Sequence, residues 1–297
     1  MATSAYGDAL GTAAVGSGSS ALLGGNELFT NILQEAMFTA NERSVARELC
    51  RLYNISGSQG KTIQVPVYPT VSAGSVAENI DLANTAIDPT SVDISVSEFG
   101  VMTTISDLML ESAGTNLAAD VGRILGEAMA AKLDTDVFAL FSSFSTSVGD
   151  NNDAEELDAD LIFKAVATLR SNNASGQYFG VFHPKSIYNL KKTLVNNGSN
   201  IGSLSDIGND ALRSGIVGTV AGVTLIESTL VPTISSDGAV NAIFSADALG
   251  IAMKRDMRME EQRDASLRAT EYVMTGAKGQ GILQNSYGVQ IVTDNSL

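Results

Sequence analysis

The chain has 297 residues, of which 44% are hydrophobic and 17% are charged, and this is the balance of a folded protein rather than a disordered one. Its formal net charge of −15 argues against the surface of a nucleic acid as the main partner, because phosphate binding needs a basic face. Cys50 is the single cysteine, so no internal disulfide is expected, which fits assembly in a reducing cytoplasm.

The N-terminal part predicts an arm followed by a helix. Residues 1–25 are mostly Gly, Ala, Ser and Thr, and such a segment cannot bury enough surface to order itself. A helix is expected after it, with Asn26 as the N-cap residue. Four apolar residues share one face of this helix: Leu28, Ile32, Leu33 and Ala36.

Two later stretches alternate apolar and polar residues, which predicts strands. The first covers residues 60–70, where Pro66 indicates an edge or a bulge because it lacks an amide proton. The second covers residues 86–106, where the alternation slips at Ser97–Glu98, as a bulge would cause. The two strands are expected to form a long hairpin with an oversized loop at its tip.

An isolated two-stranded hairpin is marginal in water, so this one is expected to lie against something else. We expect Val92, Ile94 and Val96 to be poorly covered within one chain and covered by a neighbouring subunit. The apolar residues of the first strand are candidates for the same contact between subunits: Ile63, Val65 and Val67.

The rest of the chain predicts a mixed α+β fold. Residues 116–144 follow the helical period and would form one helix roughly 40 Å long. A helix is expected at 159–172 with Leu161, Ile162, Ala165, Val166 and Leu169 buried, after an acidic loop whose last acids stand at its N-terminus. Pro184 opens another helix. Short strands follow, and the apolar stretch at 214–234, interrupted by Glu227 and Pro232, is expected to form strands and not a membrane span.

Motifs for chemistry are weak. His183 is the only histidine, so a hydrolase would have to use it, and we interpret it as a locally hydrogen-bonded residue at a strand end. The acidic stretch 149–160 has Glu155 where a calcium loop needs glycine, and no metal or cofactor is expected. The glycines of "TGAKGQGIL", residues 275–283, lack dinucleotide-binding spacing and are interpreted as turns or bulges.

The stretch "KRDMRMEEQRDASLR", residues 254–268, mixes basic and acidic side chains, which favours an interface closed by ion pairs over a nucleic-acid site. Its candidates for contact between subunits are Arg255, Arg258, Glu260 and Arg263. Glu260 and Glu261 are adjacent, so on a strand they would point to opposite faces and could not act as a catalytic pair.

The order of these parts resembles the major capsid protein of tailed bacteriophages, the Hong Kong 97-type shell fold. The specific similarities lie in "GIVGTVAGVTLIESTLVP" and in "ALGIAMKRDMRMEEQRDASLRATEYVMTGAKGQGILQNSYGVQIVTD". The resemblance implies an N-terminal arm, an extended loop, a spine helix, a peripheral domain and an axial domain. The implied boundaries are 1–45 for the arm, 56–106 for the extended loop, 112–145 for the spine helix, 146–248 plus 277–297 for the axial domain, and 249–276 for the peripheral strands.

The resemblance also implies partners and a location. The subunit would assemble as hexamers and pentamers into an icosahedral virion shell, in the host cytoplasm, enclosing double-stranded DNA without sequence-specific binding. The short arm implies a separate scaffolding protein, and a portal and a decoration protein are further expected partners. Two alternatives stay open: the shell of an encapsulin-type nanocompartment, which shares the fold, and a soluble hydrolase using His183.

Overall fold

The structure is a computed structural model. It describes residues 20–69, 71–76, 78, 81, 84, 86–112, 117–149, 155–197, 218–234 and 238–296. Most of the expected arm and parts of the hairpin loop and of the acidic stretch therefore lie outside the described residues. The described residues fall into two compact units, the first within Met1–Ser44, Glu98–Lys132 and Asp256–Gly276, and the second within Val45–Ser97, Leu133–Arg255 and Ala277–Leu297.

The second unit contains a six-stranded mixed sheet with the strand order β5-β12-β9-β6-β8-β7. Strands β12 and β9 pair antiparallel, and β6 pairs in parallel with β8 and antiparallel with β9. The strands are β5 (Ser147–Val148), β6 (Tyr178–Phe182), β7 (Thr219–Val220), β8 (Val223–Glu227), β9 (Gly238–Ser245) and β12 (Gly288–Asp294), and the helices and turns that accompany them are α5 (Ala159–Ser171), α6 (Pro184–Asn197) and the 3-10 turn η2 (Asn285–Tyr287).

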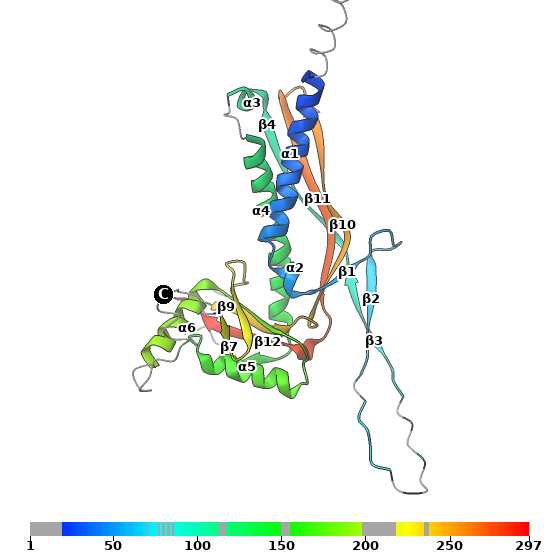
Figure 1. The fold of residues 1–297 in the computed structure, drawn as a ribbon, viewed down its shortest axis with the longest axis vertical. Helices are drawn as coiled ribbons and strands as arrows, with labels where there is room; N and C mark the ends of the chain where they lie inside the picture. Colours follow the sequence, from blue (N-terminus) through cyan, green and yellow to red (C-terminus); the bar gives the residue numbers. More distant parts are fainter. Residues whose placement is uncertain are drawn as a thin grey trace, which may run out of the picture. The chain divides into compact units, whose positions relative to one another are not determined.

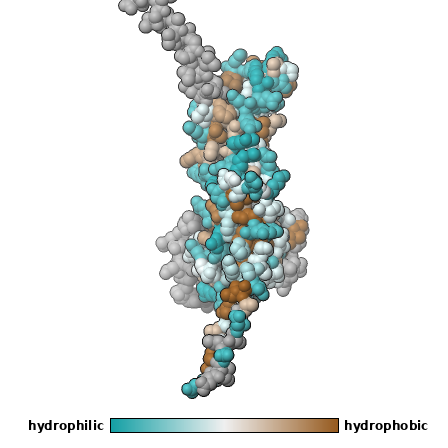
Figure 2. All heavy atoms as spheres, turned by 90° about the vertical axis from the view of Figure 1, so that its right-hand side faces the viewer, coloured by the Kyte–Doolittle hydropathy of each residue, from teal (hydrophilic) through white to brown (hydrophobic). Residues whose placement is uncertain are grey.

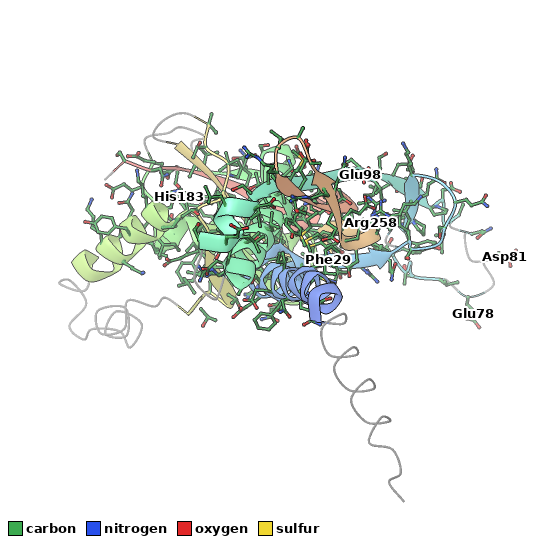
Figure 3. All side chains as sticks on the ribbon, turned by 90° about the horizontal axis from the view of Figure 1, so that it is seen from above. Phe29, Glu78, Asp81, Glu98, His183 and Arg258 are labelled. Carbon is green, nitrogen blue, oxygen red and sulfur yellow. The ribbon has the colours of Figure 1, made fainter. Side chains whose placement is uncertain are left out.

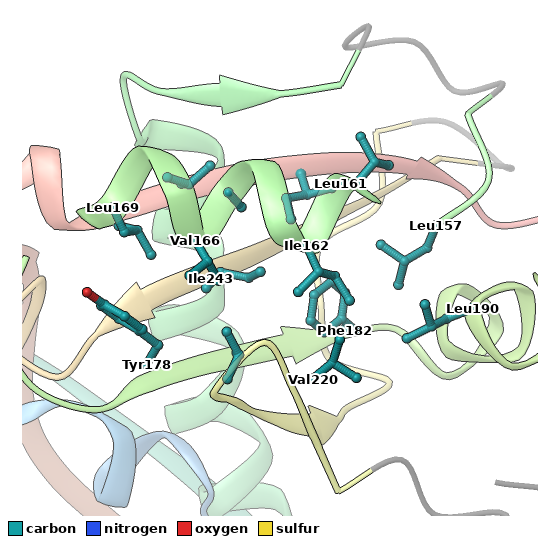
Figure 4. Packing of buried hydrophobic residues seen from close by; sticks show 14 of the residues in the cluster. Leu157, Leu161, Ile162, Val166, Leu169, Tyr178, Phe182, Leu190, Val220 and Ile243 are labelled. Atoms are coloured by element: carbon teal, nitrogen blue, oxygen red, sulfur yellow. The ribbon is translucent and has the colours of Figure 1, made fainter. Parts of the chain in front are cut away.

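Helix α5 covers one face of this sheet and contributes five buried residues to the core between them (Figure 4). The five residues expected on its apolar face are all buried: Leu161, Ile162, Ala165, Val166 and Leu169. The carboxylate of Asp158 stands at the helix N-terminus and accepts a hydrogen bond from the Ala159 N–H at 2.6 Å. The prediction of this helix from the 3.6-residue period is confirmed within one residue at its C-terminal end.

A second core in the same unit surrounds an aromatic group. Phe138 and Phe141 stack with ring centroids 5.2 Å apart, and Phe141 lies 5.5 Å from Phe244 of β9. Buried aromatic pairs at these separations stabilise a core beyond their area alone. Cys50 lies in this cluster, where burial followed by the charge of Asp134 raises its pKa to about 12, so its thiol stays protonated.

The first unit packs residues of α1 (Ser20–Arg43) and α4 (Leu117–Phe138) against residues of β4 (Ser97–Ser106), β10 (Leu249–Asp264) and β11 (Ala269–Ile282) (Figure 1). Its core consists of Ile32, Ala36, Ile105, Leu125, Met129, Met259, Tyr272 and Met274. It also contains α3 (Asp107–Ser112), whereas α4, β10 and β11 each continue into the second unit. The second unit further contains α2 (Ala46–Leu49), β1 (Arg51–Asn54) and the 3-10 turn η1 (Ala139–Ser143), and β1 joins the four-stranded sheet of order β1-β10-β11-β4.

Two helix boundaries differ from the sequence prediction. Helix α1 begins at Ser20, so Asn26 lies inside it and is not its N-cap residue. The helix expected at 116–144 is α-helical only from Leu117 to Phe138, and a 3-10 turn follows. The apolar period continues through Phe141 and Phe144 because both rings belong to the core, and apolar spacing alone does not separate an α-helix from a tighter turn.

Candidate assembly surfaces

The predicted hairpin is present as a two-stranded antiparallel sheet of β2 (Thr62–Val67) and β3 (Thr90–Ser95). Its register pairs Ile63 with Ile94 and Val65 with Val92. Residues that are directly opposite in an antiparallel pair share a face, so the apolar residues of both strands form one side of the hairpin. The sequence prediction that these two stretches form one hairpin is therefore confirmed.

The predicted irregularity of the returning strand is also present. The strand is interrupted at Val96: β3 ends at Ser95 and pairs with β2, whereas β4 begins at Ser97 and belongs to the four-stranded sheet. The Val96 N–H donates to the Lys61 carbonyl at 2.7 Å, which extends the hairpin bonding by one step. The interruption thus precedes the expected Ser97–Glu98 position by one residue.

At the end of the hairpin near the body of the unit, the expectation that Val92, Ile94 and Val96 are poorly covered within one chain is wrong for Ile94 only; Val92 and Val96 are half-buried, so their cover by a neighbour stays a prediction. Ile94 is 0% exposed and Val65 is 8% exposed. Both belong to a cluster with Ile55, Ala252 and Leu283, so the chain covers them with its own β10 region and with the residue after β11. We call this end the hairpin root: residues 62–65 and 92–96. Val92, Val96 and Ile63 are half-buried there.

The distal part of the hairpin has large exposed apolar side chains. Tyr68 is 65% exposed, Val71 53%, Val76 51% and Ile87 55%. The acidic side chains Glu78 and Asp81 point outward from the same loop (Figure 3), and Figure 2 shows hydrophobic residues among hydrophilic ones on its surface. We call residues 68–76 and 86–89 the distal loop. Val67 joins the two regions and is half-buried.

The charged strand forms ion pairs within the chain. The guanidinium of Arg263 donates two hydrogen bonds to the carboxylate of Asp107, at 2.5 and 2.6 Å. This hydrogen bonding lowers the pKa of the Asp107 carboxyl below its ordinary value. Arg258 pairs with Glu260 at 2.9 Å, and both side chains are more than half exposed. Arg255 is half-buried. Pairs at such exposure add little stability, so their use between subunits stays a prediction.

The sequence interpretation missed an exposed apolar group at the start of α3. Leu108 is 75% exposed, and Met109 and Leu110 are 47% and 41% exposed. No residue of this short helix is buried. The signal was available, because three consecutive large apolar residues cannot share one face of a helix. Ile124, expected on the buried face of α4, is also 61% exposed.

His183 lies at the junction of β6 and α6, where it caps the N-terminus of the helix. Its Nδ1 accepts a hydrogen bond from the Lys185 N–H at 3.3 Å, in the position of an N-cap. Its own N–H donates to Asn241 Oδ1 at 2.8 Å. Burial lowers the pKa of the imidazole, and the hydrogen bond with Asn295 opposes this effect. The hydroxyl of the nearby Ser186 is shared with Thr293 at 2.9 Å, so these contacts orient Ser186 toward a threonine and not toward a base.

Among the described residues, no cluster of three or more His, Cys, Asp or Glu side chains could hold a metal ion. When length and hydropathy are considered together, none of the helices in the described part of the chain qualifies as a membrane span.

Comparison with solved structures shows the same fold in viral and virus-like shells. The capsid of cyanophage P-SCSP1u matches with a TM-score of 0.65 at 19% identity over 85% of this chain and 89% of that one. The head of Helicobacter pylori bacteriophage KHP40 matches with a TM-score of 0.65 at 14% identity, covering 84% and 89%. A virus-like particle from Pyrococcus furiosus matches with a TM-score of 0.60 at 11% identity, covering 89% and 98%. The fold is thus that of the Hong Kong 97-type shell subunits.

The family follows from the sequence itself. A family model described as phage capsid protein matches residues 89–285, which is more than half of the chain. No curated protein matches the sequence. The chain belongs to the phage capsid protein family: it is a major capsid protein, a structural component of the virion that builds a shell of many subunits.

Proposed function

We propose that the chain assembles as hexamers and pentamers into an icosahedral head that encloses viral double-stranded DNA. Membership of the phage capsid protein family supports the head, and the exposed apolar residues of the distal loop support contact between copies. The net charge of −15 suits a container whose wall does not hold DNA, because like charges repel.

The observation that carries this proposal is the distal loop. Tyr68, Val71, Val76 and Ile87 are each more than half exposed, on a hairpin that has only two strands in its own sheet. The subunit covers the paired strands at the hairpin root itself but leaves these four large side chains exposed, so a neighbouring copy would supply their cover. The neighbour would cover the distal loop and not Ile94 and Val65, which the subunit covers itself.

We assign positions in the shell on the same basis. The unit that contains the six-stranded sheet would include the axial domain, 146–248 plus 277–297, which packs around the capsomer axes. The spine helix at 112–145 and the strands at 249–276 would form the peripheral domain. Assembly would take place in the host cytoplasm with a separate scaffolding protein and a portal, and a decoration protein is a further candidate partner.

Expression followed by electron microscopy of negatively stained material tests the proposal. The chain is expressed alone and together with a candidate scaffolding protein from the same genome. Closed particles are the expected result, and DNA is expected inside the particles that form in infected cells; a chain that stays monomeric in every condition would refute the proposal. Particles filled with a folded enzyme would instead support a nanocompartment shell, which shares the fold.

A variant with a shortened hairpin tests whether the distal loop makes the contact between copies. Replacing residues 70–87 with an Asn-Gly turn shortens the hairpin while keeping the paired strands, because this dipeptide favours two-residue hairpin turns. The variant is expected to fold, as judged by circular dichroism, and to form no closed particles. Normal particles from this variant would show that the distal loop is dispensable.

A further inference from the structure

The closest packing at the hairpin root involves a single side chain. Ile94 of β3 is 0% exposed and lies against Gly279 and Gly281 of β11. These two glycines are separated by one residue, so on a strand they share a face. The two glycines therefore present bare backbone to Ile94, and we call this arrangement the Ile94 socket.

The socket has no room for a side chain. A Cβ atom at Gly279 would lie 2.4 Å from the carbonyl oxygen of Ser95 and 3.0 Å from Ile94 Cγ2. A Cβ atom at Gly281 would lie 3.0 Å from Ile94 Cγ1. The two positions differ in kind, because Gly279 meets backbone that cannot rotate away, whereas Gly281 meets a side chain that can adjust.

The packing beside the socket is open by comparison. A cavity of about 630 Å³ is lined by Ile63, Gln64 and Asp93 of the hairpin with the loop before β2. Another of about 300 Å³ is lined by Val65, Pro66 and Val67 with Tyr53 and other residues of the second unit. Lys254 adds a hydrogen bond from its Nζ to the Gly60 carbonyl. The socket is thus the point where the hairpin is held by close contact.

We propose that the Ile94 socket sets the direction in which the hairpin leaves the subunit. The strand is interrupted at Val96, two residues after the socketed residue Ile94, so β3 and β4 are not one continuous strand that would fix the angle of β3. This inference rests on the proposed function, in which the distal loop reaches a neighbouring copy. Gly279 and Gly281 are then positioning residues for assembly, because a small displacement at the root becomes larger at the distal loop.

The test measures the hairpin direction in the unassembled subunit. Two exposed serines of the second unit are replaced by cysteine: Ser91→Cys on the hairpin and Ser171→Cys at the end of α5. A nitroxide label is then attached to each new cysteine. Pulsed electron paramagnetic resonance then gives the distribution of distances between them. Cys50 is buried and keeps its thiol protonated, so labelling at that position is expected to be slow.

Three glycine variants are compared with the labelled parent. Gly279→Ala is expected to shift or broaden the distance distribution most, and Gly281→Ala to shift it less. Gly74→Ala is the matched control, because a Cβ atom there meets nothing within 4 Å. Circular dichroism establishes that each variant is folded. If neither Gly279→Ala nor Gly281→Ala changes the distribution in a folded subunit, the proposal is overturned.

A second set of variants distinguishes the effects of the two glycine substitutions. In an Ile94→Ala background the Gly281 methyl group meets only the Cβ of residue 94, at the ordinary contact distance of 4.0 Å. Gly281→Ala should therefore cause no further change there, whereas Gly279→Ala should still cause one through the Ser95 carbonyl. Equal effects of Gly281→Ala in both backgrounds would contradict the socket.

Particle yield completes the experiment. Gly279→Ala is expected to lower the yield of closed particles by about tenfold or more, which corresponds to a loss of roughly 1.4 kcal/mol at one contact. If the parent forms no particles but the distance distributions change as expected, the proposed function fails and the socket stands. If the parent forms particles and the distributions are unchanged, the socket fails and the proposed function stands.

Discussion

The α5 region and the hairpin bury apolar residues in opposite ways. Helix α5 buries its whole apolar face against strands of its own sheet, and Leu169 and Ile162 are each 0% exposed. The hairpin buries only the residues at its root, and Val71 and Ile87 beyond it remain more than half exposed. Val71 and Ile87 lie outside the alternation of β2 and β3, whose apolar residues are buried or half-buried within the chain. In both regions regular apolar spacing accompanies cover by the same chain, and the exposed residues of the hairpin lie where that spacing ends.

The difference separates stability from assembly. Residues around α5 contribute to the free energy of unfolding of the subunit, since their burial is complete before any neighbour arrives. Distal-loop residues contribute almost nothing to that quantity until a neighbour covers them. Substitutions of equal size in the two regions should thus affect different measurements.

The largest expected effect on stability comes from Ile162→Ala. Ile162 lies on the buried face of α5 and is 0% exposed, so its truncation should lower the free energy of unfolding of the subunit by about 2–5 kcal/mol. Urea denaturation followed by circular dichroism measures the loss. Ile87→Ala removes the same atoms from a side chain that is 55% exposed, and the expected change is about 0.5 kcal/mol or less.

In an assembly assay the order of the two effects should reverse. Ile87→Ala should lower the yield of closed particles at a temperature where the subunit is fully folded. Ile162→Ala should assemble normally wherever enough folded subunit survives. Equal losses of stability in the two variants would contradict the comparison, because Ile87 would then already be covered within one chain.

A smaller loss of stability is expected where a buried carboxylate binds backbone. Asp134 of α4 is 3% exposed and accepts hydrogen bonds from the Val45 N–H at 3.0 Å and the Ala46 N–H at 3.1 Å. Asp134→Ala should lower the free energy of unfolding by about 1.5–3 kcal/mol, because hydrogen bonds to a charged group are lost. Asp120→Asn, on the exposed side of the same helix, is the control, and its effect should stay near zero. A loss as small as the control's would mean that water replaces the carboxylate.

Much of this fold was accessible from the sequence because short-range patterns determine it. The period of residues 159–172 predicted α5 and its five buried residues, and the last acids of the preceding stretch were expected at its N-terminus, where Asp158 is the N-cap residue. The alternation in residues 60–70 and 86–106 predicted the hairpin. Helix ends were less accessible: Asn26 is a good capping residue, yet α1 extends past it to Ser20. Helix propensity does not explain this start, because Gly24 and Gly25 directly precede Asn26 and glycine is a poor helix former.

The sequence did not allow the same prediction of which residues cover the hairpin root. Gly276, Gly279 and Gly281 were interpreted as turns or bulges, but the structure places all three inside β11, and none of them is in a turn. A glycine in a strand can mark a close approach by another part of the chain, and the sequence does not say which part approaches. The partner, Ile94, is 185 positions away from Gly279. The expectation that a neighbour covers Ile94 failed for this reason.

The smallest expected effect is a pH dependence of subunit stability that arises at His183. The hydrogen bond of His183 lies within one subunit, unlike the contacts expected of the distal loop, which need a neighbouring copy. The imidazole of His183 accepts a hydrogen bond from Lys185 N–H only when Nδ1 is unprotonated. Lys185 also places a positive charge near the imidazole, while Asn241 of β9 and Asn295 after β12 contribute uncharged side chains.

Burial holds the pKa of His183 below its ordinary value of 6.5. The folded state therefore binds the proton more weakly than the unfolded state, so the stabilising contribution is complete above the unfolded pKa. It decreases as the pH falls from there through the folded pKa. Urea denaturation between pH 7.5 and 5 should show this loss in the parent, and His183→Gln should remove that part of the slope. Because this contact lies within one subunit, the slope should be the same in unassembled subunits and in particles, and a slope that appears only in particles would place His183 at an interface instead.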